Sequence, residues 1–547
     1  MGWMISTTVN GIENGVGQRN HMIIRNIRLQ VTRAASPAAM TALLLMSGSG
    51  ASADTAPAGV ATVTAQVACA TLSGKTVGGA TLVTAVVPAN AAVPTYCKVN
   101  GTLEPALNFE IRLPDAWNGK LYYGGGGGYN GLIPPLVVPA LTQGYAQVVS
   151  DSGHQGDGMS AAFALTDTFA AQLFGSLSVP MVMSTALESV TAAYGAPPAK
   201  SYFEGCSNGG REALMAVQRN PNLFDGVIAR APAYNWVGFN GAFQRTAQAL
   251  AAPGGAFSAE KAALLAKHVR KACDGLDGIV DGVVSNPAAC TTKVSNVAAL
   301  RCAGGADSGN TCLSDAQLAV VQVWTSDAVF NGSSTYRSGG YNLTGNEDDA
   351  GNFGIWVSGN SNVKSAGQYL VQDNTVKYYL ARDAKADSLA YAPWDQNQSA
   401  LYALAALNDA TQTNIRPFVN SGGKLIVWHG GSDSALSVNS TIEYFTHMQQ
   451  SIGAANTAAA TRFYVAPGVN HCEGGPGADT SDLLTALDQW VTKGVAPDTL
   501  SAQKLDKSGA VTRTVPLCQF PQYPKYTGRA KDAAAARLAS SYTCTSP

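Results

Sequence analysis

Short apolar segments alternate with helix-like segments between residue 54 and about residue 235. The apolar segments are rich in aromatic and β-branched residues and are only four to six residues long, which is typical of buried strands. These segments cover residues 109–113, 120–123, 145–149 and 199–204. Residues 169–194 have the apolar spacing of a helix, with Pro180 as a break or kink. The alternation predicts an α/β fold with a mostly parallel sheet.

The pattern changes between residues 234 and 412, where Gly, Asn, Ser and Asp become frequent and four cysteines cluster. Tryptophans and tyrosines are scattered through this stretch, so it is too aromatic to be disordered and too long to be a loop. The α/β pattern then resumes at residues 423–428 and 460–465. We therefore expect a lid domain at 234–412, inserted between core segments at 54–233 and 413–547.

Residues 1–53 have the features of a signal peptide with an N-terminal extension. Arginines at 25, 28 and 33 precede an apolar run at 38–46, and Ala51-Ser52-Ala53 matches a cleavage site. An ordinary hydrophobic N-terminal helix is the alternative. The apolar run is too short to cross a bilayer, and the sequence offers no other candidate span, so we expect no membrane partner.

Composition narrows the classes of partner. Of the 547 residues 13% are charged, and the formal net charge is −1. The chain has no Lys/Arg run, which makes nucleic acid an unsuitable partner, and nothing indicates an obligate protein partner. Ten cysteines, an even number, all follow the proposed cleavage site, and no two are spaced as C-x-x-C. Such cysteines predict disulfides and a secreted or periplasmic protein.

The segment Gly205-Cys-Ser-Asn-Gly209 has the pattern G-x-S-x-G. It lies between the strand-like residues 199–204 and helix-like residues 211–219, which is the context of a nucleophile elbow. Glycines on both sides of the serine relieve the crowding of a sharp strand-to-helix turn. We predict that Ser207 is a catalytic nucleophile; a purely structural turn is the alternative.

A serine nucleophile needs a general base, which an acidic residue in turn orients. In this fold the acid and then the base follow the serine in the chain. His471 follows the strand-like residues 460–465 and lies on a loop, so we assign it as the base. Asp433 follows the strand-like residues 423–428 and is assigned as the acid, with a turn-forming role as the alternative. The remaining histidines apart from His429 lie in the leader, precede the serine, or fall in helix-like segments; they are His21, His154, His268 and His447.

Five consecutive glycines, Gly124 to Gly128, follow the strand-like residues 120–123. Backbone without side chains can bring N–H groups close to a substrate oxyanion. We expect the N–H groups of Gly125 and Asn208 to be the two oxyanion donors, although a flexible loop is possible. We expect His429 to line the substrate pocket or to hydrogen-bond its own loop.

With these residues assembled, the chain resembles the tannase/feruloyl esterase family of α/β-hydrolases over residues 69–544. The most specific segments are 205–212, 224–232 and 468–477. The resemblance implies an α/β-hydrolase core with a large inserted lid domain. It also implies a disulfide between Cys206 and Cys472, which would preorganise the serine and the histidine. The other pairs implied are Cys69–Cys97, Cys273–Cys290, Cys302–Cys312 and Cys518–Cys544.

The resemblance further implies a structural calcium ion (Ca2+) in the lid. Closely spaced carboxylates with carbonyls between them suit a hard cation. The implied ligands are the side chains of Asp274, Asp277 and Asp281 and the carbonyls of Ile279 and Val283.

For the substrate pocket, the resemblance points to Trp356. The segment that would carry a carboxylate-binding arginine has none between Arg337 and Arg382, and Lys364 is the candidate cation there.

We thus expect a serine carboxylic-ester hydrolase that cleaves esters of aromatic acids, of the feruloyl, hydroxycinnamoyl or galloyl type, with a small aromatic ester as substrate. One alternative is activity on a terephthalate monoester. A second is a non-catalytic, calcium-stabilised binding protein on a hydrolase scaffold. A peptidase or lipase with the same triad is a further rival, although a lipase would carry a long apolar lid helix.

Overall fold

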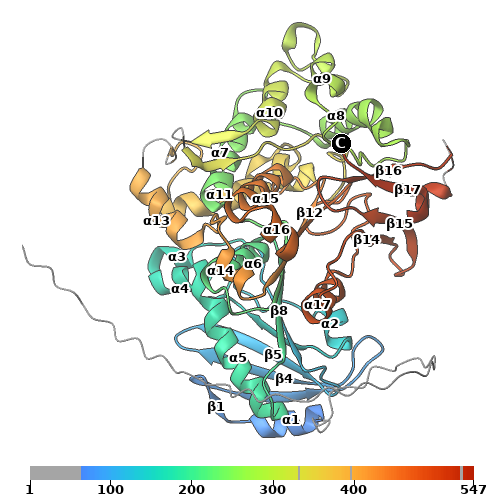
Figure 1. Cartoon of the computed structure of the whole chain (residues 1–547). Helices are drawn as coiled ribbons and strands as arrows, with labels where there is room; N and C mark the ends of the chain where they lie inside the picture. Colours follow the sequence, from blue (N-terminus) through green and yellow to red (C-terminus); the bar gives the residue numbers. More distant parts are fainter. Residues whose placement is uncertain (1–62, 331–332, 393, 395–396, 530–531, 533) are drawn as a thin grey trace, which may run out of the picture. The chain divides into compact units, whose positions relative to one another are not determined.

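A nine-stranded sheet, in the order β13-β12-β9-β8-β6-β7-β5-β4-β3, forms the centre of the fold (Figure 1). The structure is a computed structural model that describes residues 63–547 except 331–332, 393, 395–396, 530–531 and 533. The predicted leader, residues 1–53, lies outside the described residues. The strands are β3 (Val83–Val87), β4 (Tyr96–Leu103), β5 (Leu107–Pro114), β6 (Lys120–Gly124), β7 (Ala146–Ser150), β8 (Lys200–Cys206), β9 (Gly226–Arg230), β12 (Lys424–Gly430) and β13 (Thr461–Ala466).

Strands β13, β12, β9, β8, β6 and β7 run parallel, and β5, β4 and β3 add an antiparallel edge. This mixed, mostly parallel sheet confirms the predicted α/β-hydrolase fold class. Parallel strands end at the same edge of a sheet, so the segments that follow β6, β8, β12 and β13 come together there. Those segments contain the predicted glycine loop, serine, aspartate and histidine.

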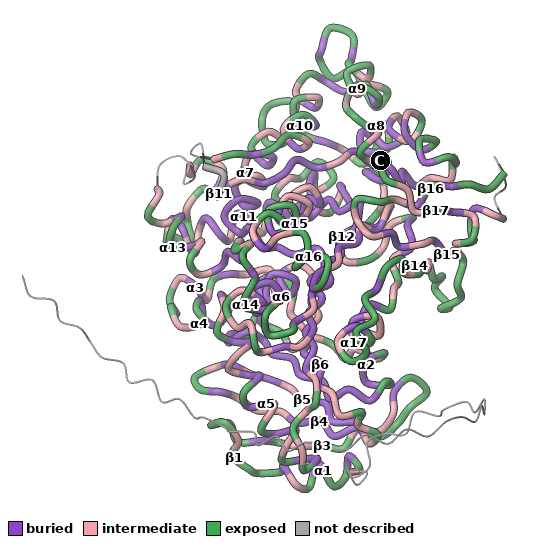
Figure 2. The backbone as a smooth tube through the Cα atoms, viewed as in Figure 1, coloured by how far each residue is buried: buried purple, intermediate pink, exposed green. Residues whose placement is uncertain are grey.

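Successive residues of each central strand pack into different hydrophobic clusters, as the period of two in a strand requires. Tyr202 and Ile426 belong to one cluster, whereas their neighbours Phe203 and Val427 belong to the other. All four are fully buried, and Figure 2 shows the central strands largely in the colour of buried residues. Both faces of the sheet are therefore covered. The helices around it are α1 (Ala65–Leu72), α2 (Val138–Thr142), α3 (Phe163–Thr166), α6 (Asn208–Arg219), α14 (Arg416–Asn420), α15 (Val438–Ile452), α16 (Ala454–Ala460) and α17 (Leu483–Lys493).

The predicted long helix at 169–194 forms with an irregularity next to Pro180. It consists of α4 (Thr168–Gln172), a π-helical turn η1 (Leu173–Leu177) and α5 (Ser178–Tyr194). Proline lacks an N–H and its ring collides with the carbonyl four residues earlier, so the wider turn lies just before it. By length and composition this helix could cross a membrane, but 61% of its most apolar window is buried, which is typical of a core helix.

The segment between β9 and β12 holds its own hydrophobic cluster, with Trp236, Phe243, Trp324 and Phe353 among its buried members. Its helices and strands are α7 (Trp236–Ala251), α8 (Ala259–Cys273), α9 (Thr292–Ser295), α10 (Asp315–Thr325), β10 (Ala328–Phe330), β11 (Ser333–Ser338), α11 (Gly367–Asn374) and α13 (Gln398–Asn408). The described residues lie in one compact unit, so the boundaries 234–412 of the lid remain a prediction.

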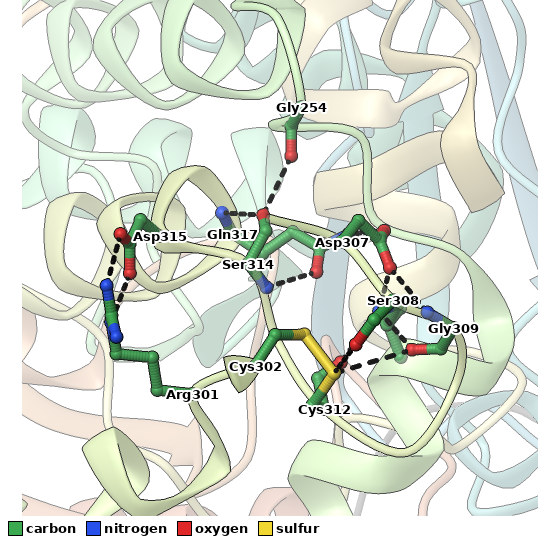
Figure 3. Close-up of a disulfide and its surroundings, with 11 residues drawn as sticks. Gly254, Arg301, Cys302, Asp307, Ser308, Gly309, Cys312, Ser314, Asp315 and Gln317 are labelled. Carbon is green, nitrogen blue, oxygen red and sulfur yellow. Dashed lines mark hydrogen bonds and ion pairs between the residues drawn. A yellow bond between two sulfur atoms is a disulfide. The ribbon is translucent and has the colours of Figure 1, made fainter. Parts of the chain in front are cut away.

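Disulfide Cys302–Cys312 closes a short loop in this inserted segment (Figure 3). Ser314, just beyond the loop, is the N-cap of α10 and forms a capping box with Gln317. The Ser314 hydroxyl also donates to Gly254 O at 3.1 Å, so the loop is tied to the end of α7. A disulfide and a helix cap thus order a stretch that is poor in apolar residues.

Small two-stranded sheets complete the fold at both ends of the chain. They are β1 (Thr76–Val77) with β2 (Ala80–Thr81), β14 (Leu500–Leu505) with β15 (Val511–Leu517), and β16 (Tyr523–Tyr526) with β17 (Tyr542–Thr545). The Cys518–Cys544 disulfide links the region after β15 to β17. With Cys69–Cys97 and Cys273–Cys290, the structure contains all five pairs that the resemblance implies.

Candidate active site

Ser207 lies at the sharp turn between β8 and α6, with φ 62° and ψ −120°. A non-glycine residue in this region is strained by about 1–3 kcal/mol. The turn is crowded: a Cβ on Gly205 would lie 2.5 Å from the carbonyl carbon of Gly209. Only glycines fit at both positions, so the G-x-S-x-G pattern is a steric requirement of the elbow. Ser207 N donates to Arg230 O at 3.1 Å, which joins the elbow to β9.

The structure brings Asp433 and His471 into direct contact. His471 Nδ1 lies 2.8 Å from Asp433 Oδ2. The other carboxylate oxygen, Oδ1, accepts the N–H groups of Ala435 at 2.7 Å and Leu436 at 2.9 Å. The Asp433 side chain is completely buried. Burial alone would raise its pKa, but the adjacent imidazoles, His471 foremost, hold the pKa of this carboxyl well below its usual value.

His429 does not line the substrate pocket, which corrects the predicted substrate-binding role. It is fully buried, and its Nε2 lies 3.1 Å from Asp433 Oδ2 and 3.1 Å from Leu436 O. Its Nδ1 lies 2.9 Å from the Thr441 hydroxyl. Because β12 continues to Gly430, His429 points into the core and not toward the strand end. Asp433 is thus held by two imidazoles.

Ser207 and His471 line the same cavity. Their chain neighbours Cys206 and Cys472 form a disulfide with Cα atoms 6.0 Å apart, across a sequence separation of 266. Cys472 has φ 66°, so the backbone on the histidine side is also strained. Among the described residues, no hydrogen bond joins the Ser207 hydroxyl to His471. The cavity and the disulfide bring the two side chains together.

The cavity is lined mainly by apolar and aromatic side chains. Its volume is about 110 Å³, comparable to engineered cavities of about 150 Å³ that bind benzene. Trp356, in the turn η5 (Gly354–Ser358), contacts His471 edge-on with ring centroids 5.1 Å apart. This agrees with the predicted pocket position of Trp356. The other large lining residues are Tyr129, Met159, Trp236, Phe239, Phe243, Val371 and Leu436.

Apart from Trp356, the aromatic wall of the cavity was not predicted from the sequence. Trp236, Phe239 and Phe243 recur at helical spacing in α7, and such a stripe is indistinguishable from one that faces a core. The Tyr129 hydroxyl bonds to Val371 O and to the Thr375 hydroxyl, both at 2.8 Å, so it is not free for a ligand. The only sequence signal for Tyr129 is its place directly after the glycine run.

Of the two predicted oxyanion donors, the structure supports Asn208 and corrects Gly125. Asn208 is the first residue of α6, where helix geometry leaves the N–H without an intrahelical partner, and it lines the cavity beside Ser207. Gly125 N, however, donates to Glu204 O at 2.9 Å because the pairing of β6 with β8 continues past Gly124. Its amide is therefore engaged in the sheet.

Later glycines of the run are better placed to donate. Gly126 N donates to the Glu212 carboxylate at 2.9 Å. The amides of Gly127 and Gly128 have no hydrogen-bond partner in the part of the chain that is described. Of these two residues, Gly128 lines the cavity with Ser207. Its φ of 55°, and the contact of 2.2 Å that a Cβ would make with Gly158 O, explain why this position is glycine.

Lys364 lies outside the cavity, which corrects its predicted role in substrate binding. It is exposed in the short turn η7 (Val363–Ser365) and is absent from the cavity lining. Lys377, the other cation in this segment, is paired with Asp373 at 2.7 Å. The described residues that line the cavity include no Lys, Arg, Asp or Glu.

The predicted calcium ligands lie in one loop, but their carboxylates bind protein groups. Asp274 accepts the N–H of Gly282 at 3.0 Å, and Asp277 accepts that of Ser285 at 2.9 Å. Asp281 pairs with Arg513. Within the described residues, no group of three or more His, Cys, Asp and Glu side chains is close enough to hold a metal ion.

Two of these carboxylates nevertheless lack an opposite charge. Asp274 and Asp277 are buried and form no ion pair with any described residue. Burial raises the pKa of both, that of Asp277 to about 6. The carbonyl-bearing residues Ile279 and Val283 are buried beside them. The loop thus has the oxygen chemistry that a hard cation prefers, without a convergent set of carboxylates.

The mixed sheet, the strained serine between β8 and α6, and the buried carboxylate–imidazole pair after β12 and β13 define a protein of the α/β-hydrolase class. The profile of the tannase and feruloyl esterase family matches residues 90–545, so the chain belongs to that family. It is accordingly a carboxylic ester hydrolase.

Relatives in sequence agree with this assignment, and a solved structure shares the fold. The chain is 32% identical to mono(2-hydroxyethyl) terephthalate hydrolase of Piscinibacter sakaiensis over 513 residues, covering 80% of this chain and 83% of the relative. It is 29% identical to a probable feruloyl esterase of Arthroderma benhamiae over 473 residues, covering 80% and 84%. Feruloyl esterase B of Aspergillus oryzae has a similar fold, with a TM-score of 0.74 at 23% identity and coverage of 85% and 96%.

Proposed function

We propose that the protein hydrolyses esters of uncharged aromatic acids, of the hydroxycinnamoyl type, through an acyl-enzyme on Ser207. The observation that carries this proposal is the cavity at the elbow, which is aromatic, about the size of one ring and without Lys, Arg, Asp or Glu among its described lining residues. An aromatic acyl group would fill it by stacking and edge contacts with Trp356, Trp236 and Phe239.

In the proposed mechanism, His471 Nε2 takes the hydroxyl proton as Ser207 Oγ bonds to the ester carbonyl carbon. Asp433 holds Nδ1 of the imidazole and stabilises the imidazolium that forms. The tetrahedral oxyanion accepts hydrogen bonds from the N–H groups of Asn208 and Gly128. Each such donor contributes about 3 kcal/mol in comparable enzymes.

The carbon–oxygen bond to the alcohol then breaks, and the alcohol leaves with the proton from His471. Water repeats the sequence on the acyl-enzyme: His471 removes a proton from water, and the acid departs as Ser207 recovers its proton. Every step uses side chains and amides of this chain.

The lining residues favour a sparsely hydroxylated ring. A galloyl group carries three hydroxyls, and burying them without partners would cost about 1–3 kcal/mol each. Tyr129, the one phenol among the described lining residues, already has both its partners inside the protein. A terephthalate monoester carries a carboxylate, for which the described lining offers no cation. We therefore place both below a feruloyl ester in preference.

Rates on methyl ferulate, methyl gallate, a terephthalate monoester and a short p-nitrophenyl ester test this order. We expect kcat/KM for methyl ferulate to exceed that for methyl gallate and for the terephthalate monoester by about tenfold or more, as one unpaired buried polar group implies. Equal or better turnover of either competitor would contradict the proposed pocket. Ser207→Ala should abolish turnover of every ester while the fold is retained. An unchanged turnover rate in this variant would favour a different active site.

We also propose that the loop 274–283 holds a structural calcium ion, which would offset the buried charges of Asp274 and Asp277. A chelator should then lower the melting temperature, and added calcium should restore it. Asp277→Asn should remove that response. A melting temperature that is insensitive to both chelator and calcium would reject the ion.

The five disulfides are typical of proteins that fold in an oxidising compartment. Together with the features of residues 1–53 they support the proposal that the protein is secreted or periplasmic. Fractionation of the native host, with detection of the processed N-terminus, would test it.

A further inference from the structure

Glu212 lies one turn after Asn208 in α6 and is 6% exposed. Its two carboxylate oxygens accept hydrogen bonds from groups around the oxyanion hole. Oε2 accepts from Gly126 N at 2.9 Å. Oε1 accepts from Asn130 Nδ2 at 2.6 Å, Asn208 Nδ2 at 3.2 Å and the Ser152 hydroxyl at 3.3 Å. One buried carboxylate therefore joins the glycine loop to the start of the nucleophile helix.

The Asn208 side chain is held from both sides. Its Nδ2 donates to Glu212 and also to Asn130 Oδ1 at 3.0 Å, while its Oδ1 accepts from Arg211 Nε at 2.6 Å. Arg211 is fully buried and donates from its outer nitrogens to Phe174 O and Gly175 O. These bonds fix the residue whose backbone N–H is the proposed first oxyanion donor.

The glycine loop is held by its contact with the start of α6 and by its hydrogen bond to the Glu212 carboxylate. A Cβ on Gly209 would lie 2.6 Å from Gly126 O, so the loop backbone rests directly on the helix start. The half-buried Gly126 N–H donates to Glu212, and removing that acceptor would leave the amide without its partner. Gly128, which lines the cavity, lies two residues further along. Only Gly127 separates the two residues, so a displacement of Gly126 would also move Gly128.

Glu212 forms no ion pair with any described residue, and its four donors all lie on the segments that surround the elbow. A carboxylate that served only to stabilise the fold would be better paired with a cation or replaced by an apolar side chain. A carboxylate with two oxygens is, in contrast, the group that can accept from a backbone amide and from two carboxamides at once.

We propose that Glu212 is a positioning residue of the oxyanion hole. It sets the distance between the Asn208 amide and the glycine loop before substrate binds, so that the developing charge meets donors that need no rearrangement. The inference rests on the proposed serine mechanism and adds the group that organises its donors.

Glu212→Gln tests the inference, because glutamine keeps the shape but replaces one acceptor oxygen by a donor NH2 group. The N–H groups that donate to that oxygen in the wild type would then face the NH2 group of the glutamine, and we expect the glycine loop to shift away. Removing an oxyanion donor outright lowers kcat by about 100- to 1,000-fold in comparable enzymes. For a displaced donor we expect kcat to fall about 10- to 100-fold, with KM for methyl ferulate within about twofold of wild type, since the donors act mainly on the transition state.

Glu110→Gln is the matched control. Glu110 is a largely buried glutamate on β5 that pairs with Arg112, away from the elbow, and its loss should leave kcat unchanged. A folded Glu212→Gln protein with kcat within twofold of wild type would overturn the inference. A parallel fall in kcat for Glu110→Gln would show a general effect of a lost buried carboxylate and would overturn it as well.

The outcome separates this inference from the proposed mechanism. If Ser207→Ala is inactive and Glu212→Gln is fully active, the mechanism stands and the positioning role fails. If Ser207→Ala remains active, the mechanism itself fails.

Should Glu212→Gln not fold, amide hydrogen exchange of the wild-type protein at single-residue resolution decides. The Gly126 amide should exchange at least tenfold more slowly than that of Gly127, and equal rates would overturn the inference.

Discussion

Cys206 and Cys472 are separated by 266 residues in sequence but are bonded, with their Cα atoms 6.0 Å apart. Each directly adjoins a residue of the proposed triad, Ser207 on one side and His471 on the other. A bond between the two loops limits how far the serine and the imidazole can move apart. Its contribution is therefore to preorganise the site as well as to stabilise the fold.

Replacing both cysteines, in Cys206→Ala with Cys472→Ala, should lower kcat on an aryl ester about tenfold or more. Closing a loop of this length contributes at most about 6 kcal/mol by chain entropy, so the free energy of unfolding should also fall. Steady-state kinetics and denaturant unfolding measure the two effects. Unchanged kcat in a destabilised but folded variant would show that the bond has no role in the site.

The matched control is Cys302→Ala with Cys312→Ala, which removes the disulfide shown in Figure 3. Its loop is short, so the chain-entropy loss is about 3 kcal/mol. Because this loop lies away from the elbow, kcat should remain near the wild-type value. A loss of kcat equal to that of the first pair would point to a global effect of any lost disulfide.

His429→Phe should lower kcat through Asp433 although His429 does not reach the cavity. It removes the nitrogen that lies 3.1 Å from the buried carboxylate. We expect a fall of about tenfold in kcat, little change in KM, and a loss of about 1–3 kcal/mol in stability. A change in KM alone would contradict this support role.

The pH dependence of that stability loss follows from the lowered pKa of Asp433. A depressed folded-state pKa stabilises the protein above the ordinary carboxyl pKa of about 4, and this contribution is lost as the pH falls. The difference in the free energy of unfolding between wild type and His429→Phe should hence be largest above pH ~4 and should shrink toward lower pH. Denaturant unfolding at a series of pH values checks this sign.

Asp409→Asn should stabilise the protein at neutral and higher pH. Burial raises the pKa of Asp409 to about 7, and its Oδ2 has no hydrogen-bond partner among the described residues. Because the pKa of Asp409 is raised on folding, the wild-type protein keeps its full stability below the ordinary carboxyl pKa. It loses stability as the pH rises toward the pKa of Asp409 in the folded state. The increase in the free energy of unfolding caused by Asp409→Asn should grow between pH ~4 and ~7 and reach at most about 4 kcal/mol. A gain independent of pH would contradict it.

Trp356→Ala should raise KM for methyl ferulate several-fold, because the indole forms part of the cavity wall and contacts His471. Trp356→Phe keeps an aromatic face and should have a much smaller effect. Initial-rate kinetics over a range of ester concentrations separate KM from kcat. If both variants change only kcat, the ring acts on His471 and not on the substrate.

Local patterns in the sequence were sufficient for the elements that carry the site. Strand β8 with α6 and strand β12 were predicted within a few residues, because burial of both sheet faces leaves continuous apolar segments. Ser207, Asp433 and His471 follow from chain order and from loops after strands. The structure places all three at one edge of the sheet, and Asp433 and His471 are hydrogen-bonded.

Errors arose where a role depends on the direction of a single group. Gly125 was predicted as a donor, but the register of β6 against β8 directs its amide to Glu204 O. For His429, the predicted role in lining the pocket was wrong, whereas the alternative, a hydrogen bond within its own loop, is what the structure shows. Lys364 was chosen as the candidate cation of its segment, yet it is exposed and lies outside the cavity. Neither register nor side-chain direction can be inferred from spacing alone.

The sequence by itself determined the class of fold and singled out Ser207, Asp433 and His471 as the proposed triad, because strand burial, glycine sterics and loop position are local properties. The tertiary structure decided which amides of the glycine run remain unpaired among the described residues. It also decided that the segment between β9 and β12 contributes aromatic residues to the cavity wall, and that Glu212 joins the two sides of the elbow. These features depend on contacts between segments that are far apart in the chain, and such contacts leave no periodic signal in either segment.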